Sequence, residues 1–238
     1  MSRILILGKS GFGKTFSIGK VPELGHEGLD PKKTYIISIT SKPLPFPNSA
    51  TDYIVAEPKK YNSSNRYITN DPEEVTLLIK ALKASNFENI IIDDFNYLLQ
   101  DYYMMNALKG GWETPKKIGY FTAQIFQAIE EYRDINKHIF VLAHGEDIIL
   151  PDNRIYTKFK TVGKMVDEYI TPEGKFDITL IGVSRYDATK RQVIKEFATN
   201  ETEYNSAPKS PYGMFQDLYI PNDLGYVVQQ INKYYHKN

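Results

Sequence analysis

The sequence predicts an α/β protein in which a mostly parallel sheet carries helices on both faces. Three observations support this class: four apolar runs typical of buried strands, helical segments between them, and hairpin patterns after residue 145. Parallel strands need long crossover connections, usually helices, and a strand buried on both faces is apolar throughout. The order of the elements therefore favours a parallel sheet that ends in a C-terminal β-hairpin extension.

The strands are expected where short apolar runs are rich in β-branched residues. These runs lie at residues 4–7, 34–41, 89–93 and 138–144, with a short extra strand at 50–56. Hairpins are expected to turn at residues 151–153 and 186–189, where turn-forming residues interrupt the strand pattern.

The helices are expected where apolar residues recur at helical spacing. The first is short and ends near residue 19, and the next spans about 71–85, with Asp71, Pro72 and Glu74 resembling a capping box. A third helix follows residue 95 and is closed by Gly110 and Gly111, and a fourth covers about 115–135. Two more are expected within 160–170 and 223–235.

The composition is that of an ordinary globular protein. The 238 residues carry no net charge, so any nucleic-acid contact must come from a local patch. The absence of cysteine excludes disulfides and cysteine metal sites and fits a reducing compartment. No run approaches 18 apolar residues, and the first strand leaves no room for a signal peptide, so we expect a cytoplasmic protein without membrane contact.

A glycine-rich segment follows the first strand directly. Gly8, Gly13, Lys14 and Thr15 match the spacing G-x-x-x-x-G-K-[ST]. In such a loop, backbone N–H groups surround phosphate oxygens, the lysine reaches the β- and γ-phosphates, and the threonine hydroxyl holds Mg²⁺. The residues expected to bind the nucleotide are Gly8, Lys9, Ser10, Gly11, Phe12, Gly13, Lys14 and Thr15. The alternative is a glycine-rich strand-to-helix turn with an accidental lysine.

This motif also suggests how the chain is organised. We expect one domain over residues 1–238. Residues 1–145 would form the nucleotide-binding core, and 146–238 would supply hairpins and a C-terminal segment that complete the sheet.

Two carboxylates end the apolar run NIIIDD. Asp93 is expected to hold Mg²⁺, through a water molecule, together with Thr15. Asp94 lies where many ATPases of this type place a catalytic base, and we consider it for that role. Aspartate is also a good N-cap, so Asp94 could instead cap the helix that begins at residue 95.

His144 lies at the carboxyl end of another buried strand. If this strand is next to the loop strand, His144 faces the γ-phosphate and acts in catalysis as its sensor. The alternative is a histidine that only bonds local backbone. A further positive charge on the transferring phosphate is expected from the same chain or a neighbouring subunit. The candidates are Arg133, Arg154, Arg185, Arg191 and Lys209, of which Lys209, on a proline-rich loop, is also considered a nucleotide contact.

One stretch after the fourth strand is locally basic. Tyr156, Lys158 and Lys160 would share one face of a hairpin strand, with Lys164 just beyond. Such a patch suits single-stranded nucleic acid, although a solvated hairpin explains it equally well.

Seven motifs in order resemble a known family, the compact RecA-like P-loop ATPases of tailed bacteriophages, some of which act in single-strand annealing and recombination. The motifs are GKSGFGKT (8–15), KPLPF (42–46), NRYITNDPEEV (65–75), NIIIDDFNYL (89–98), VLAHGED (141–147), TVGKMVDEYI (161–170) and PKSPYGMF (208–215).

The resemblance implies a RecA-like core in which the 138–144 strand lies between the loop strand and the 89–93 strand. It also implies ATP as the nucleotide, assembly into a ring or filament, and single-stranded DNA with a single-strand-binding or annealing protein as partners. A phage-encoded protein would work in the host cytoplasm. One departure is clear. RecA-type recombinases carry a catalytic glutamate at the tip of the second core strand, where this chain has ITSKP. Thr40 and Ser41 cannot serve as that base, so the task would fall to Asp94.

Two other functions remain open from the sequence. A nucleoside or nucleotide kinase would keep the loop but need an acceptor pocket and an arginine-rich lid, for which Arg185 and Arg191 are the only hint. An ATP-dependent assembly module with little turnover would fit the aspartate that replaces a glutamate base. Turnover that depends on a small acceptor would favour the kinase, and tight ATP binding without turnover would favour the module.

Overall fold

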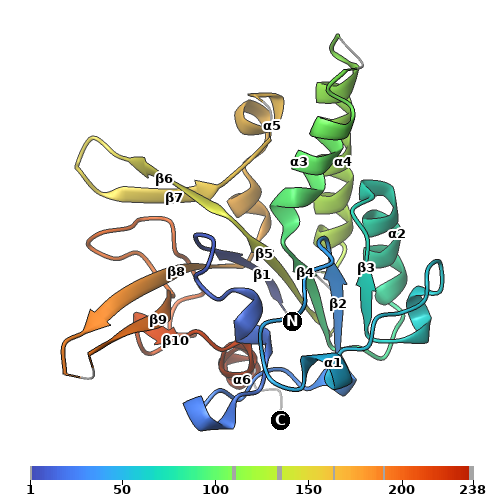
Figure 1. Ribbon diagram of the computed structural model, residues 1–238. Coiled ribbons are helices and arrows are strands. Elements are labelled where there is room, and N and C mark those ends of the chain that lie inside the picture. Colours follow the sequence, from blue (N-terminus) through green and yellow to red (C-terminus); the bar gives the residue numbers. More distant parts are fainter. Residues whose placement is uncertain (1, 109–110, 133–135, 163, 190, 236–238) are drawn as a thin grey trace.

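An eight-stranded sheet forms the centre of the computed structural model, which describes residues 2–108, 111–132, 136–162, 164–189 and 191–235 (Figure 1). Its strand order is β10-β9-β8-β1-β5-β4-β2-β3. The strands from β8 to β3 pair in parallel, whereas β9 and β10 are antiparallel to their neighbours. The strands of this sheet are β1 (Ser2–Leu7), β2 (Thr34–Ser38), β3 (Arg66–Ile68), β4 (Asn89–Asp93), β5 (His138–Ala143), β8 (Ile178–Asp187), β9 (Gln192–Ala198) and β10 (Tyr219–Pro221).

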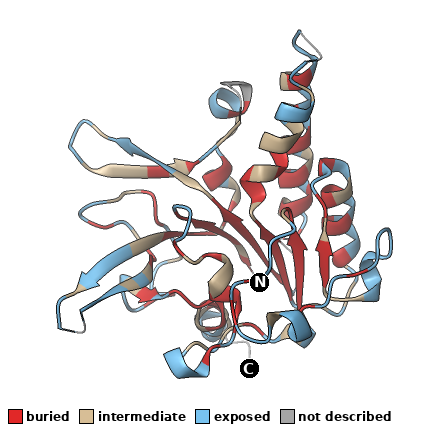
Figure 2. Ribbon diagram, in the orientation of Figure 1, coloured by how far each residue is buried: buried red, intermediate tan, exposed pale blue. Residues whose placement is uncertain are grey.

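Two apolar clusters cover the two faces of the sheet. Along β1, Leu5 and Leu7 belong to one cluster and Ile4 and Ile6 to the other, and all four are fully buried. This alternation explains why the run is apolar at every position. Figure 2 shows the buried residues concentrated on the sheet and on the sides of the helices that face it.

The helices lie on both faces of the sheet. The larger cluster includes residues of α2 (Pro72–Leu82), α3 (Phe95–Met105) and α4 (Glu113–Glu130), and the other includes α6 (Leu224–Tyr234) and the 3-10 helix Thr15–Ile18. The remaining helical segments are α1 (Ser49–Asp52), α5 (Lys164–Tyr169) and the 3-10 turns Pro22–Leu24, Pro31–Lys33, Tyr61–Ser63 and Pro172–Lys175. None of the helices in the described part of the chain has the length and apolarity to cross a membrane.

Two hairpins extend from the sheet to the same side (Figure 1). The first pairs β6 (Gly145–Ile149) with β7 (Ile155–Phe159) and continues directly from β5. The second pairs β8 with β9, and β8 also lies beside β1 within the main sheet. The C-terminal hairpin therefore both widens the sheet and projects beyond it.

The predicted fold class is confirmed: an α/β protein with a mostly parallel sheet, helices on both faces and a C-terminal hairpin. The strand β5 lies between β1 and β4, which is the order expected of a RecA-like core. The predicted strand at 50–56 is wrong: Ser49–Asp52 is helical, and Val55 forms only an isolated bridge to Arg66. The edge strand β3 was not anticipated, because its three residues are too short to show a period.

The start of α2 also differs from the prediction. Asp71 caps the helix as expected, because its carboxylate accepts a 2.9 Å hydrogen bond from the Glu73 N–H. The Glu74 carboxylate does not complete a capping box. It accepts hydrogen bonds from the hydroxyls of Tyr67 and Thr69 instead, which ties the helix to the end of β3.

Candidate functional site

A cavity of about 750 Å³ lies at the carboxyl edge of the parallel strands. Because β1, β2, β4 and β5 run in the same direction, the residues that follow them meet at this edge. Lys14, Thr15, Asp93, Asp94 and His144 all line the cavity. The structure therefore brings together the five side chains predicted to act in catalysis or metal binding.

The glycine-rich loop is anchored to the core by one aromatic side chain. Phe12 is 5% exposed, and its ring lies 5.8 Å from the ring of Phe197. A Cβ on Gly182 would come within 2.7 Å of the Phe12 ring, so β8 must carry a glycine there. Phe12 thus acts through its buried side chain to hold the loop, while its neighbours face the cavity.

Gly13 is required for both its backbone angle and its surroundings. Its φ of +106° is one that side chains rarely allow, and an added Cβ would meet Nδ2 of Asn222 at 3.0 Å. That same Nδ2 donates a 3.1 Å hydrogen bond to the Gly13 carbonyl oxygen. The strand-to-helix region after β10 therefore helps to set the shape of the loop.

Lys14 directs its ammonium into the loop. Nζ donates to the carbonyl oxygens of Gly8 at 2.9 Å and Lys9 at 3.2 Å. Burial lowers the pKa of Lys14 to about 8, against the opposing effect of Asp94 and Asp93. A cation so poorly hydrated gains strongly from an anionic ligand, because the ligand replaces the missing water.

Thr15 and Asp93 form a hydrogen-bonded pair of the kind that fits Mg²⁺. The Thr15 hydroxyl donates to Oδ1 of Asp93 at 2.9 Å. Burial, followed by repulsion from Asp94, raises the pKa of Asp93 to about 6. A hydroxyl and a buried carboxylate supply the hard oxygen ligands that Mg²⁺ takes, with the remaining positions left to water and phosphate. Among the described residues there is no cluster of three or more His, Cys, Asp or Glu that would hold a metal alone.

Asp94 does not cap the helix that follows it. It occupies the N-cap position of α3 with a left-handed φ of 62°, but its side chain makes no cap hydrogen bond. Oδ2 instead accepts a 2.9 Å bond from the Thr40 hydroxyl and lies 3.6 Å from Nζ of Lys42. A positive φ at a non-glycine residue is unusual and is often found at functional sites. Here it turns the carboxylate toward the cavity.

His144 lies between the loop and the first turn of α3. Its Nδ1 is 3.5 Å from Nζ of Lys14, and its ring packs edge-on against Tyr97. Burial and the charge of Lys14 lower the pKa of His144, which favours a neutral imidazole. The His144 N–H donates to the side chain of Asn96, whose Nδ2 in turn donates to the Lys160 carbonyl oxygen at 2.6 Å.

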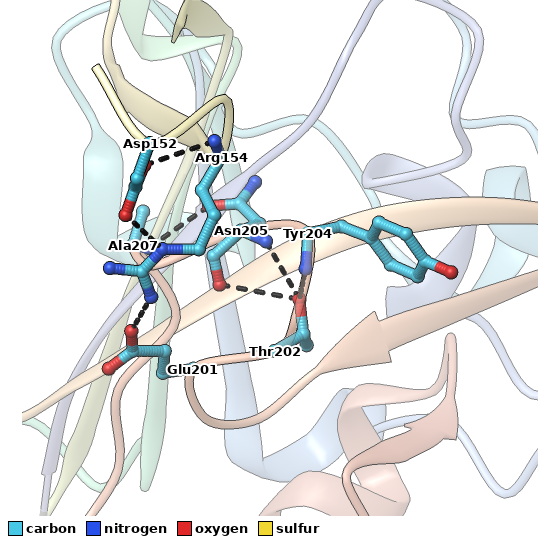
Figure 3. Close-up of polar contacts among 7 residues, drawn as sticks. All are labelled: Asp152, Arg154, Glu201, Thr202, Tyr204, Asn205 and Ala207. Carbon is cyan, nitrogen blue, oxygen red and sulfur yellow. Dashed lines mark hydrogen bonds and ion pairs between the residues drawn. The ribbon is translucent and has the colours of Figure 1, made fainter. Parts of the chain in front are cut away.

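None of the predicted arginines in the described part of the chain lines this cavity. Arg154 pairs with Asp152 and Glu201 at the far end of the β6–β7 hairpin (Figure 3), and Arg185 pairs with Glu196. Arg191 is exposed, and Arg133 lies outside the described residues.

Lys209 lies away from this cavity within the chain. The backbone N–H and carbonyl groups of Lys209 both hydrogen-bond to Thr179 of β8, and Thr179 pairs with Leu5 of β1. Lys209 does not line the cavity. Its charge acts on Asp177, at the opposite edge of the sheet from the loop. Any contact with a nucleotide across a subunit boundary stays a prediction.

The basic face of the hairpin is weaker than its sequence suggests. Lys158 donates a 2.7 Å hydrogen bond to Asp167, which neutralises it, and Tyr156 is half-buried. Lys160 is exposed, and the side chain of Lys164 lies outside the described part of the structure. A loop from the C-terminal part supports this hairpin through Asn205, whose Nδ2 donates to the Thr157 hydroxyl. The side-chain oxygen of Asn205 accepts from the Ala207 N–H within the loop (Figure 3).

Six lining or supporting residues were not expected from the sequence. Lys195 on β9 donates a 2.7 Å hydrogen bond to the Gly11 carbonyl oxygen, and Asn222 bonds Gly13. Neither carries a sequence signal, because each meets the loop only through the order of strands. The other four residues follow the ends of β2 and β4, and this location is the sequence signal that could have indicated them. They are the partners of Asp94 and His144: Thr40, Lys42, Asn96 and Tyr97.

Comparisons with known proteins give a single kind of likeness. No family model and no curated protein matches the chain. Among solved structures, the chain is similar to the KaiC-like protein PH0186 from the hyperthermophilic archaeon Pyrococcus horikoshii OT3. The TM-score is 0.44 and the sequence identity 12%, over 82% of this chain and 76% of that one.

Proposed function

We propose that the chain binds ATP with Mg²⁺ and hydrolyses the terminal phosphate. The observation that carries this proposal is the meeting of Lys14, Thr15, Asp93, Asp94 and His144 around one cavity of about 750 Å³. A phosphate loop alone would only bind. The Thr15–Asp93 pair for the metal, the carboxylate of Asp94 and a neutral imidazole at His144 would supply what hydrolysis further needs.

The contacts of each side chain support a proposed role in binding the nucleotide or Mg²⁺. Lys14 would leave the carbonyl oxygens of the loop for the β- and γ-phosphates. Thr15 would bind Mg²⁺ directly and Asp93 through a water molecule. The ion, when bound, neutralises charge on the phosphate oxygens. His144 is held beside Lys14 and would donate a hydrogen bond to the terminal phosphate.

Asp94 would act as the general base. It takes a proton from a water molecule, whose oxygen attacks the terminal phosphorus. The bond from that phosphorus to the bridging oxygen breaks, and ADP leaves with the electron pair. The left-handed backbone of Asp94 and its bond to Thr40 support this role, because they hold the carboxylate away from the helix end.

We further propose that the protein acts as an oligomer on single-stranded DNA, with a single-strand-binding or annealing partner, in phage recombination or replication. The order of its motifs supports this proposal, and it likewise supports ATP rather than GTP as the nucleotide. One contact agrees with it. The Lys160 N–H donates to the His144 carbonyl oxygen at 3.0 Å, so a strand bound along the β6–β7 hairpin would lie close to the proposed sensor.

The second candidate is an ATP-dependent assembly module with little turnover. One observation favours it: Asp94 is engaged by both Thr40 and Lys42, and a carboxylate with two partners is a weaker base. A kinase receives no such support. Arg185 is paired with Glu196, and no arginine lines the described cavity.

Steady-state ATP hydrolysis by the purified protein with Mg²⁺ tests the proposal, with and without single-stranded DNA and against Lys14→Ala. Turnover that is stimulated by DNA and lost in the variant is the expected result. Turnover indifferent to DNA would leave an ATPase and reject the DNA partner. Equal rates in wild type and Lys14→Ala would reject ATP hydrolysis at this loop. Tight ATP binding without turnover would favour the assembly module.

A further inference from the structure

Lys42 lines the same cavity as Lys14 and lies beside the carboxylate of Asp94. We propose that Lys42 binds the terminal phosphate of the nucleotide from the same chain and so supplies the auxiliary positive charge. This inference rests on the proposed binding of ATP at the loop.

The backbone of Lys42 is held by the buried side chain of Arg66. Nη2 of Arg66 donates to the Lys42 carbonyl oxygen at 2.7 Å, and its Nε donates to the Ser38 hydroxyl at 3.0 Å. Arg66 is only 7% exposed, although burial of a guanidinium is costly unless its donors are used. Leu44 and Phe46 are buried in the core just beyond. These contacts therefore fix the backbone position of Lys42.

The ammonium of Lys42 is placed but not tightly bound. Nζ lies 3.6 Å from Oδ2 of Asp94 and 4.8 Å from the ring centroid of Tyr97. Its side chain is 65% exposed, so this ion pair is weak and easily exchanged. Asp94 keeps the Thr40 hydroxyl as a partner when Lys42 moves. Lys42 can therefore turn from Asp94 to a nearby anion without leaving the carboxylate unpaired.

A terminal phosphate would attract Lys42 more strongly than Asp94 does. It carries more negative charge than one carboxylate, and charge builds on its outer oxygens as the phosphoryl group transfers. Among the described residues, the lysines that line the cavity are Lys14, Lys42 and Lys195, and Lys195 is bonded to Gly11 on the other side of the loop. Lys42 is the one beside Asp94 and Tyr97, at the end where hydrolysis is proposed.

Two consequences follow for the nucleotide. Lys42 would contact a triphosphate but not a diphosphate, so it should contribute to preference for ATP over ADP. Its move would also remove a positive charge from the side of Asp94, which makes the carboxylate a stronger base for the proton of the attacking water. Lys42 transfers no proton itself and acts only by charge.

Binding and turnover of Lys42→Ala and Lys42→Gln test the inference. We would measure the Kd of a non-hydrolysable ATP analogue and of ADP, both with Mg²⁺, by calorimetry, and then kcat for ATP. We expect Kd for the analogue to rise roughly tenfold and Kd for ADP to change less than about twofold. We expect kcat to fall about 10²-fold, as for other lost transition-state charges, and Lys42→Arg to retain most of it.

Lys60→Ala is the matched control. Lys60 has a similarly exposed side chain and an ion pair with Glu57, and it does not line the cavity. This variant should match wild type in all three measurements. If it does, any effect at Lys42 cannot be ascribed to loss of an exposed lysine as such.

The outcomes separate this inference from the proposed function. If wild type binds the analogue, Lys14→Ala does not, and the Lys42 variants match wild type, only the role of Lys42 is wrong. An equal rise in Kd for the analogue and for ADP in the Lys42 variants would also overturn it, because Lys42 would then affect the shape of the cavity without contacting the terminal phosphate. If wild type binds neither nucleotide, the proposed function and this inference both fail.

Discussion

The Thr15 hydroxyl donates a 2.9 Å hydrogen bond to Oδ1 of Asp93, which joins the end of the phosphate loop to the end of β4. The carboxylate in this pair is 6% exposed, and burial raises its pKa to about 6 from 3.8. The surroundings of Asp93 therefore favour the neutral carboxyl group over the ionised carboxylate. Such a site costs stability without a cation and gains from one.

Asp93→Asn should make the protein more stable near neutral pH while removing its response to Mg²⁺. A shift of about two pKa units, at 1.36 kcal/mol each, limits the gain in the free energy of unfolding to about 3 kcal/mol. The folded pKa is raised, so the stability due to protonated Asp93 is full below about pH 4 and lost as pH rises to about 6. Urea unfolding at about pH 7.5 and pH 4.5 measures it, and the gain should shrink at the lower pH.

The exposed Asp217 provides the control, because Asp217→Asn removes a carboxylate that water already solvates. It should change the free energy of unfolding by less than about 0.5 kcal/mol at either pH. A less stable Asp93→Asn near neutral pH would show that the ionised carboxylate is stabilising, which contradicts the raised pKa.

Asp94→Asn should keep nucleotide binding and lose hydrolysis. The substituted amide retains the shape of the carboxylate and can still accept from Thr40, but it cannot take a proton from water. We expect kcat to fall about 10²–10⁴-fold, the usual contribution of a general base, with little change in the Kd of an ATP analogue. Single-turnover hydrolysis with titrated binding measures both. Turnover that survives would remove Asp94 from the reaction.

His144 should make the folded protein sensitive to acid. Burial and Lys14 lower its pKa below the ordinary 6.5, so the unfolded chain binds more protons in the window between the two values. The stability due to His144 therefore decreases as pH falls through that window. We expect His144→Gln to gain stability relative to wild type on going from about pH 7.5 to pH 5.5, measured by urea unfolding. A constant difference between the two proteins would show an unperturbed imidazole.

The parallel core of the fold could be predicted from sequence because its signals are local. Runs such as residues 90–92 are apolar at every position, as is typical of a strand buried on both faces. Short edge segments lack such a signal. β3 has three residues and is formed by its pairing with β2. Residues 50–56 have strand-like composition, but Ser49–Asp52 is helical and Val55 forms only an isolated bridge to Arg66 of β3.

The candidate site was predictable only in part for the same reason. Lys14, Thr15 and Asp93 belong to motifs whose spacing reflects their chemistry, and His144 follows a strand end. Asn222 contacts Gly13 across 209 residues, and nothing near it in the sequence indicates this. The sequence of the ITSKP segment indicates that a glutamate is missing but not what its side chains contact. Its hydroxyl and ammonium, at Thr40 and Lys42, meet Asp94 through the pairing of β2 with β4.

Asn96 offers a test of how the cavity is joined to the β6–β7 hairpin. Its side chain is 1% exposed and accepts from the His144 N–H while donating to the Lys160 carbonyl oxygen. His144 and Lys160 are the residues at the base of the two hairpin strands, and α3, which carries Asn96, begins directly after Asp94. One amide therefore links the proposed base, the proposed sensor and the hairpin.

Asn96→Ala should loosen the hairpin and weaken its connection to the nucleotide. The His144 N–H and the Lys160 carbonyl oxygen both lose their partner, and because these groups are only partly buried, the free energy of unfolding should fall by roughly 1–3 kcal/mol. Hydrogen exchange of residues 145–160, with and without an ATP analogue, is the decisive measurement: wild type should gain protection there on binding and the variant should not. Asn106→Ala removes an amide at the C-terminal end of α3 whose Nδ2 donates to the Tyr102 carbonyl oxygen, and this variant should behave as wild type. Equal protection in wild type and Asn96→Ala would mean that the hairpin responds to nucleotide without this amide, and β5 itself would then be the remaining connection between His144 and the hairpin.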